Sequence, residues 1–245
     1  MICSSIKINK KRVNLQGRYI FIGNRRINMS LTEDATDVAL ALGKGVYSVG
    51  QDLAYGLDRT GEGLGLGNSG RISEIGYENR AMYNLMKEFV SFGIENKKSP
   101  LFKSIVTILE HYYVYMSEDT VYQLAKQAGV AASYTTGRMV VGKSLAEAVT
   151  VRIAASIAAS ATYKILAKKL GVSSAFGVTG VGIPISMFMM QGVLQRSSLS
   201  ATRLRMKAPL LHSKLKKNGN YQFLYFILEK PLSKYIEVIG KAENL

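Results

Sequence analysis

Apolar residues recur at intervals of three or four along most of the chain. They follow this spacing from Leu31 to Leu57, from Ile72 to about Gly93 and from Pro100 to Met116. Such spacing gives a helix one apolar face to bury and leaves a polar face in water. The pattern therefore predicts a mainly helical chain with roughly seven to nine helices.

Capping signals locate several of these helices. Ser30 and Glu33 form a capping box, in which a hydroxyl at the helix start is followed three residues later by a glutamate. A helix beginning there makes Met29 the natural start of the folded domain. Further starts are predicted at Pro100, at Ser117 for a helix reaching Ala128, and at Pro231 for a last helix, Leu232 to about Ala242.

A long run without charge, Leu170–Gln195, follows a predicted helix that spans Ser144–Lys169. The run is long enough to cross a hydrocarbon layer of ~30 Å. Two interpretations remain open: a membrane hairpin, or a buried hairpin inside a soluble bundle. In the second, the Gly-rich part is a loop and Pro184 begins a helix that reaches Leu204.

Small residues punctuate both arms of this apolar pair, and they allow another helix to approach closely in lipid. The fold class predicted is an all-α, multi-helix bundle with a central Ala/Gly-rich apolar helical hairpin. Pro184 kinks or splits the second arm. The residues expected to serve membrane insertion are Ala154, Ala158, Gly177, Gly180, Gly182, Pro184 and Gly192.

The domain organisation follows from two further stretches. Gly61–Gly70 is too rich in glycine for a regular helix, and we interpret it as a hinge within a single helical domain, 29–245. Residues 1–28 carry seven Lys or Arg and no acid. They form either a basic arm or a translated leader ahead of Met29. Tyr221–Leu228 fits a helix or a strand.

The net charge is +15, which favours anionic partners. A second basic segment, Arg196–Lys217, again contains no acid. Anionic lipid is the expected partner of this segment. Nucleic acid ranks below it, because base-stacking aromatic residues are not interleaved with the basic ones. The candidate docking residues are Arg196, Arg203, Arg205, Lys207 and Lys216.

Residues 137–144 match the phosphate-binding pattern G-x-x-x-x-G-K-[ST] through Gly137, Gly142, Lys143 and Ser144. In a P-loop, Lys143 would bind the β- and γ-phosphates and Ser144 would bind Mg²⁺. No apolar strand precedes the motif, so an ordinary helix start competes with this interpretation. A P-loop nucleotide-binding protein remains an alternative function, and the main enzymatic one.

Other catalytic signals are sparse. His111 stands beside Glu110 and near Glu118 and Asp119, which makes it a weak candidate base. The single cysteine, Cys3, excludes an internal disulfide and a Cys-rich metal site. No nucleophile elbow or zinc signature is present in the sequence. We therefore predict a protein that is not an enzyme and has no cofactor or metal.

In architecture, the chain from Met29 to Leu245 resembles a small pore-forming interbacterial toxin, either a type VI secretion effector or a colicin-like pore domain. The resemblance is carried by the apolar pair, Ala146–Leu166 and Val172–Leu194, together with the basic surface. It departs from that pattern at Lys168 and Lys169 and at Pro184.

The resemblance implies insertion into a bilayer, ion leakage, a cognate immunity protein and a homo-oligomer in the membrane. It also implies synthesis in a bacterial cytoplasm without a signal peptide and action at a membrane after secretion into a target cell. A basic helical module that binds nucleic acid or a scaffold is the second alternative function.

Overall fold

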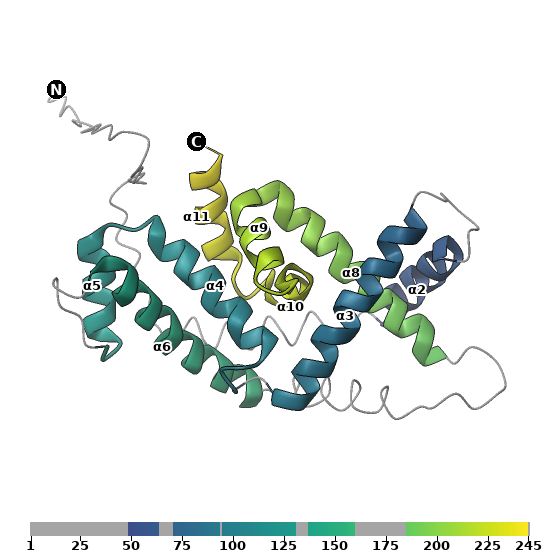
Figure 1. The fold of residues 1–245 in the computed structure, drawn as a ribbon, viewed down its shortest axis with the longest axis horizontal. Coiled ribbons are helices and arrows are strands. Elements are labelled where there is room, and N and C mark those ends of the chain that lie inside the picture. The colour runs from purple at the N-terminus through teal and green to yellow at the C-terminus, as the bar shows by residue number, and fades with distance from the viewer. Residues whose placement is uncertain (1–48, 64–70, 94, 131–136, 160–184, 245) are drawn as a thin grey trace, which may run out of the picture.

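A computed structural model describes residues 49–63, 71–93, 95–130, 137–159 and 185–244. Across these ranges the chain forms α-helices and one short 3₁₀ helix, with no strand, so the predicted all-α fold class is confirmed (Figure 1). The helices are α2 (Val49–Gly63), α3 (Ile72–Phe92), α4 (Pro100–Val114), α5 (Glu118–Gln127), α6 (Arg138–Ala159), α8 (Ile185–Lys207), α9 (Pro209–Lys217), η3 (Tyr221–Leu224), α10 (Tyr225–Leu228) and α11 (Ser233–Glu243).

The long helix α8 crosses the molecule and joins its two sides (Figure 1). It packs against α2 and α3 on one side and against α9, η3, α10 and α11 on the other. Leu194, Ala201 and Leu204 are buried, and so are the small polar residues Ser197 and Ser200. A helix covered on several sides cannot show a single apolar stripe, and α8 accordingly mixes apolar and small polar residues around its circumference.

The hydrophobic core is centred on α4. Ile105, Ile108 and Leu109 of this helix have no exposed surface. They belong to one continuous cluster that also includes Leu211 of α9 and Ile239 of α11. Burying a side chain of this size contributes about 1.5–3 kcal/mol. The C-terminal helices are therefore part of the main core.

Several sequence predictions are confirmed locally. Pro100 occupies the first turn of α4. The Ser117 hydroxyl accepts a hydrogen bond from the backbone N–H of Thr120 and caps α5. Of the two interpretations of Tyr221–Leu228, the helical one is correct, because η3 and α10 follow one another there.

Other boundaries differ from prediction. The helix expected from Ser144 begins at Arg138, directly after Gly137, whose φ of +77° suits a glycine. The expected hinge Gly61–Gly70 is helical as far as Gly63. The capping box at Ser30, the leader 1–28, the rest of the hinge, and Gly177, Gly180, Gly182 and Pro184 lie outside the described residues.

The two arms of the apolar pair have different packing partners in the described ranges. Helix α6 packs mainly on α4 and α5, whereas α8 packs mainly on α2. Within the same ranges, none of the helices is both long enough and apolar enough to cross a bilayer.

The C-terminal helix α11 meets the end of α8 at Gly240. A Cβ atom at this position would lie 2.6 Å from the backbone oxygen of Lys207. Because the obstructing atom is backbone, a side chain there cannot be accommodated by a rotamer change.

We expect Gly240→Ala to lower the free energy of unfolding by about 1–3 kcal/mol, because the methyl group overpacks the α8–α11 contact. Gly76→Ala is the matched control, since Gly76 is exposed in α3 and a methyl group there would have no neighbouring atom within 4 Å. That change should stabilise the protein by about 0.5–1 kcal/mol. Urea unfolding measures both, and equal stabilities would contradict the close approach of α11 to α8.

Candidate functional site

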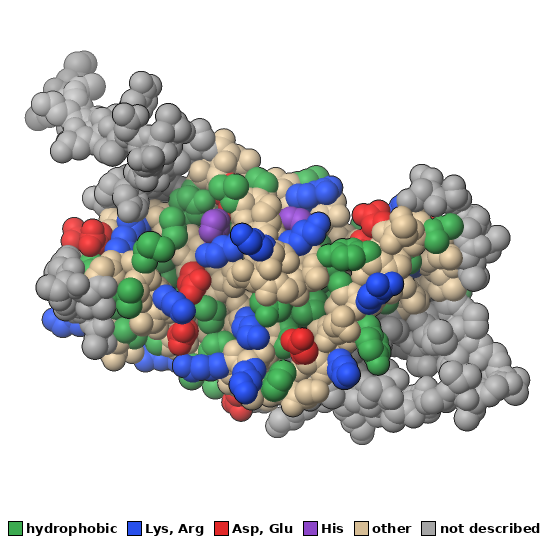
Figure 2. All heavy atoms as spheres, viewed as in Figure 1, with side chains coloured by type: hydrophobic (Ala, Val, Ile, Leu, Met, Phe, Trp, Pro, Cys, Tyr) green, Lys and Arg blue, Asp and Glu red, His purple; other side chains and the backbone are tan. Residues whose placement is uncertain are grey.

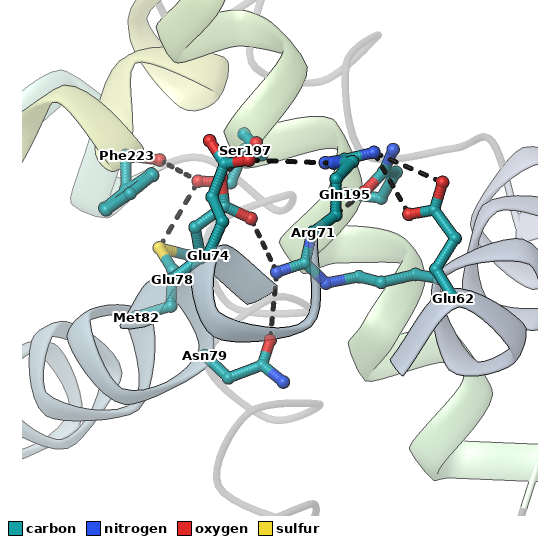
Figure 3. Close-up of polar contacts among 11 residues, drawn as sticks. Glu62, Arg71, Glu74, Glu78, Asn79, Met82, Gln195, Ser197 and Phe223 are labelled. Carbon is teal, nitrogen blue, oxygen red and sulfur yellow. Dashed lines mark hydrogen bonds and ion pairs between the residues drawn. The ribbon is translucent and has the colours of Figure 1, made fainter. Parts of the chain in front are cut away.

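A charged side chain lies fully buried where α2, α3 and α8 meet. Arg59 of α2 donates from Nη2 to Glu78 Oε2 of α3 at 2.8 Å and to Asn79 Oδ1 at 3.0 Å. Its Nη1 donates to Gln195 Oε1 of α8 at 2.9 Å. The Arg59 side chain has 0% exposure and that of Glu78 has 8%. Figure 3 shows its partners Glu78 and Asn79 of α3 and Gln195 of α8, with the contacts drawn as dashed lines.

Serines of α8 extend this cluster. The Ser198 hydroxyl donates to Glu78 Oε1 at 2.5 Å. One residue earlier, the Ser197 hydroxyl donates to the backbone oxygen of Phe223 at 2.5 Å and lies 3.3 Å from the sulfur of Met82 (Figure 3). We call the group Arg59, Glu78, Asn79, Gln195 and Ser198 the ionic latch, because it ties α2 and α3 to α8.

The ionic latch joins three helices, but burying its two charges also costs free energy. Removing two charges from water costs several kcal/mol per ion, and only good geometry and additional hydrogen bonds offset that cost. Glu78 receives such bonds from Arg59 and Ser198. The Arg59 Nε atom, however, has no hydrogen-bond partner among the described residues. The latch therefore contributes little net stability, and its main effect is to fix the position of α2 and α3 on α8.

A second, exposed tie joins α2 to the start of α3. Arg71 lies 3.0 Å from Glu62 Oε2 and 3.7 Å from Glu74 Oε2 (Figure 3). These side chains are partly or largely open to solvent, and such pairs contribute about 0–1 kcal/mol.

The basic segment has its most exposed part where α8 turns into α9. Met206 is 68% exposed and Leu210 is 58% exposed. Arg205 and Lys216 are exposed near them in sequence, and neither forms an ion pair with another residue of the described ranges. We call the exposed residues Arg205, Met206, Lys207, Leu210 and Lys216 the α8–α9 corner.

The positive charge of the α8–α9 corner affects the pKa of His212. Burial lowers the pKa of His212, and the positive charges of Arg205 and Lys216 lower it further. Both cations therefore act on the same imidazole. On the face in Figure 2, Lys and Arg side chains lie beside both histidine side chains.

Three of the predicted docking residues, Arg203, Lys207 and Arg196, lie near other side chains of the protein. Arg203 binds both carboxylate oxygens of Glu229, at 2.9 and 2.6 Å, and Lys207 lies 3.9 Å from the same carboxylate. The guanidinium of Arg196 lies 6.0 Å from the centre of the Phe226 ring. The cations of the segment thus differ in how far their charge is already balanced.

His111 is paired with a residue that sequence reasoning did not select. Its Nε2 lies 2.8 Å from Glu243 Oε1 at the end of α11. The same carboxylate accepts hydrogen bonds from the backbone N–H groups of Leu210 and Leu211, at 2.7 and 3.0 Å. Glu243 therefore caps α9 from a distant helix. This arrangement is structural, and no local sequence signal indicates it.

Tyr115 lies next to the pair formed by His111 and Glu243. Its hydroxyl lies 3.5 Å from His111 Nε2. Burial raises the pKa of Tyr115, and the negative charge of Glu243 raises it further. The phenol therefore stays neutral near pH 7.

The residues of the phosphate-binding pattern do not form a phosphate-binding loop. Positions 138–144 are helical, and the Val141 N–H bonds to the Gly137 oxygen at 3.2 Å. Arg138 donates to the backbone oxygens of Tyr113 and Val114, at 3.1 and 2.9 Å, and so caps the end of α4. A P-loop needs the N–H groups of its loop free to hold phosphate, whereas here the N–H groups from Val141 onward form helix hydrogen bonds.

The predicted insertion residues that fall in the described ranges lie inside the fold. Ala154 is 1% exposed in α6, and Ala158 packs at the edge of the core. Gly192 is buried in α8. Ala154 and Gly192 contribute to different helix contacts, because α6 and α8 have different main partners.

Comparisons with protein-family models, with curated proteins and with solved structures find no match for this chain.

We expect Glu78→Gln to lower the free energy of unfolding by about 3–5 kcal/mol, because it leaves the buried Arg59 charge without a counter-charge. Replacing both partners, in Arg59→Met with Glu78→Met, should recover a large part of that loss. Urea unfolding followed by far-UV circular dichroism measures each variant.

Glu74→Gln is the control for this prediction. Glu74 lies on the same helix as Glu78, but its ion pair is 61% exposed on the glutamate side. Its loss should cost no more than about 1 kcal/mol. A Glu78→Gln protein as stable as Glu74→Gln would show that the ionic latch does not hold the three helices together.

Proposed function

We propose that this chain is a membrane-active helical protein that binds anionic bilayers through the α8–α9 corner and acts as a pore-forming antibacterial toxin. The supporting observation is the combination of exposed apolar side chains, Met206 and Leu210, with the exposed cations Arg205 and Lys216. Apolar groups that enter the lipid surface beside cations that hold anionic headgroups are typical of interfacial binding.

The magnitudes favour reversible docking as the first step. Each Lys or Arg near an anionic membrane contributes about 1 kcal/mol. The corner offers Arg205, Lys207 and Lys216, and burying Met206 and Leu210 adds about 1.5–3 kcal/mol for each side chain. The sum is enough for salt-sensitive attachment, and it is far smaller than the energy of inserting a transmembrane helix.

Insertion of the apolar pair 144–195 requires its described parts, in α6 and α8, to leave their present contacts. Gln195, at the end of that pair, is tied to Arg59 by the ionic latch. Opening the latch detaches α2 and α3 from α8, and it frees for contact with lipid the part of α8 in which the uncharged run Leu170–Gln195 ends. In this proposal, opening of the ionic latch is the step between docking and insertion.

Once in the membrane, the small residues of the pair provide contacts between copies. Ala154, Ala158 and Gly192 lie on the described parts of the two arms and would permit close helix approach in lipid. A homo-oligomer of this kind would leak ions. A cell that makes such a toxin needs a cognate immunity protein, and that partner is part of the proposal.

Nucleic acid is the competing partner for the same positive charge. The exposed apolar residues at the corner are aliphatic, and they cannot stack on bases as aromatic side chains do. Anionic lipid therefore fits the corner better, and nucleic-acid binding is an outcome that the experiment must separate.

We expect the purified chain to bind phosphatidylglycerol vesicles at low salt and to release an encapsulated dye. Arg205→Glu with Lys216→Glu should reduce binding by at least about ten-fold, because two favourable charges become repulsive. The control is Lys87→Glu with Lys103→Glu, two exposed lysines on α3 and α4 that change the net charge equally. Co-sedimentation and fluorescence release measure the two effects.

The outcomes separate the alternatives. Binding without leakage would retain the docking surface and exclude the pore-forming function. Absence of both, together with tight salt-dependent binding to DNA, would replace the membrane proposal with a nucleic-acid one. Equal losses in both double variants would mean that net charge, rather than the corner, governs attachment.

We expect the pKa of His212 to rise when anionic vesicles bind, because lipid phosphates offset the charges of Arg205 and Lys216 that hold it low. Protonated His212 should then persist to higher pH in the bound state than in free protein. NMR titration of the imidazole with and without phosphatidylglycerol nanodiscs checks this. His111 is the internal reference, and a parallel shift of both histidines would point to a general effect of the vesicles.

A further inference from the structure

A groove runs along α11 where it faces the end of α8 and α10. Its volume is about 530 Å³, within the range of small-molecule sites. Ser233, Glu237 and Gly240 of α11, and Asn244 directly after this helix, line it at helical spacing. Across the groove, Lys207 is supplied by the end of α8. The groove therefore adjoins the α8–α9 corner, and both include Lys207.

The lining of the groove carries equal numbers of opposite charges. Lys207 and Lys241 are cationic, and Glu229 and Glu237 are anionic. Lys241 Nζ lies 2.7 Å from Glu237 Oε1, one helical turn away. A simple anion would meet the two carboxylates as well as the lysines. A ligand with both a positive and a negative group matches this lining better.

Tyr225 adds a hydrogen-bond donor to the wall of the groove. The residue is only 1% exposed, and it lines the groove. Burial raises the pKa of Tyr225, and the charge of Glu229 raises it further while Arg203 opposes this effect. The phenol is therefore neutral near pH 7, and a neutral hydroxyl in the wall of the groove can donate a hydrogen bond to a ligand oxygen.

We propose that the groove binds a phosphoethanolamine group. The phosphate accepts from Tyr225 and from Lys207 and Lys241, and the primary ammonium donates to Glu237. The ligand thereby replaces the ion pair between Lys241 and Glu237 with two ion pairs, one from Lys241 to the phosphate and one from Glu237 to the ammonium. No charge in the groove is left unbalanced. The opposite charges of the ligand are about 5 Å apart, close to the rise of one helical turn that separates positions 237 and 241 along α11.

This inference rests on the proposed function where the phosphoethanolamine belongs to a lipid. A bilayer held at the α8–α9 corner would bring headgroups to Lys207, at the mouth of the groove. The same chemical group occurs in water-soluble phosphoesters, and such a ligand needs no membrane. The two sources differ only in what is attached to the phosphate.

The solution experiment titrates the full chain with sn-glycero-3-phosphoethanolamine and follows binding by calorimetry and NMR. Inorganic phosphate and ethanolamine are the half-ligand probes. We expect saturable binding of the phosphoester and at least about ten-fold weaker binding of either half. Equal affinity for inorganic phosphate, or no binding of the phosphoester, would overturn the site.

Two variants test the assigned contacts. Tyr225→Phe keeps the buried ring and removes the donor, and it should weaken binding by about ten-fold. Tyr83→Phe, at an exposed tyrosine of α3, should leave affinity unchanged. Glu237→Gln should remove the preference for phosphoethanolamine over phosphate, whereas Glu88→Gln on α3 should not. Unchanged affinity in Tyr225→Phe, with the fold intact by circular dichroism, would overturn the assignment.

Vesicles of equal phosphatidylglycerol content distinguish the sources. Stronger attachment when the remaining lipid is phosphatidylethanolamine rather than phosphatidylcholine, with the gain lost in Tyr225→Phe, assigns the group to lipid. Binding of the soluble phosphoester without that gain assigns it to a free ligand. Anionic vesicle binding without either effect would overturn the groove and leave the proposed function standing, whereas soluble binding without vesicle attachment would do the reverse.

Discussion

The Arg59 guanidinium has no contact with solvent, so its charge must be balanced within the protein. Glu78 supplies the counter-charge, and Gln195 and Asn79 accept two further hydrogen bonds. These partners come from α3 and α8, and they can meet Arg59 of α2 only when α2 and α3 are correctly placed on α8. The arrangement of this side of the molecule thus depends on satisfying one buried cation. The cost of leaving it unsatisfied excludes alternative registers of α2 against α8.

Helix α8 contributes both to the hydrophobic core and to the buried polar contacts of the ionic latch. It forms part of the core through Leu194 and Leu204, and it supplies the polar groups of Gln195, Ser197 and Ser198. Each of these hydroxyls and amides has a protein partner, so burial is tolerable in the folded chain. In lipid the same groups would lose those partners. Any transfer of the preceding apolar run to a bilayer must therefore stop close to Gln195.

Lys207 connects the two surfaces to which we assign ligands. It is exposed at the end of α8, where it belongs to the α8–α9 corner, and it also lines the groove along α11. Glu243 holds this region together, because it caps α9 and pairs with His111 of α4. The position of the corner thus follows from a carboxylate near the end of the chain. Glu243 thus connects α9, which carries part of the exposed basic corner, to the core helix α4.

Local pattern predicts the all-helical class and several helix starts, because helix formation depends on spacing and caps that lie close together in sequence. The helices beginning at Pro100 and after Ser117 were predicted for this reason. Pattern also located the basic segment, but it treated Arg203 and Arg205 alike. Only tertiary structure brings Glu229 to Arg203 and leaves Arg205 exposed. The same holds for the P-loop pattern, because nothing in the sequence around Arg138 indicates that its side chain caps the end of α4.

Arg59 shows the limit most clearly. In the sequence it is an ordinary arginine on a polar stretch, and nothing near it predicts burial. Its partners lie 19 to 136 residues away. Hydrophobic periodicity specifies which face of each helix turns inward. Which charges then meet, and which remain in water, depends on contacts between distant segments, because electrostatic balance is a property of the packed helices and not of the chain order.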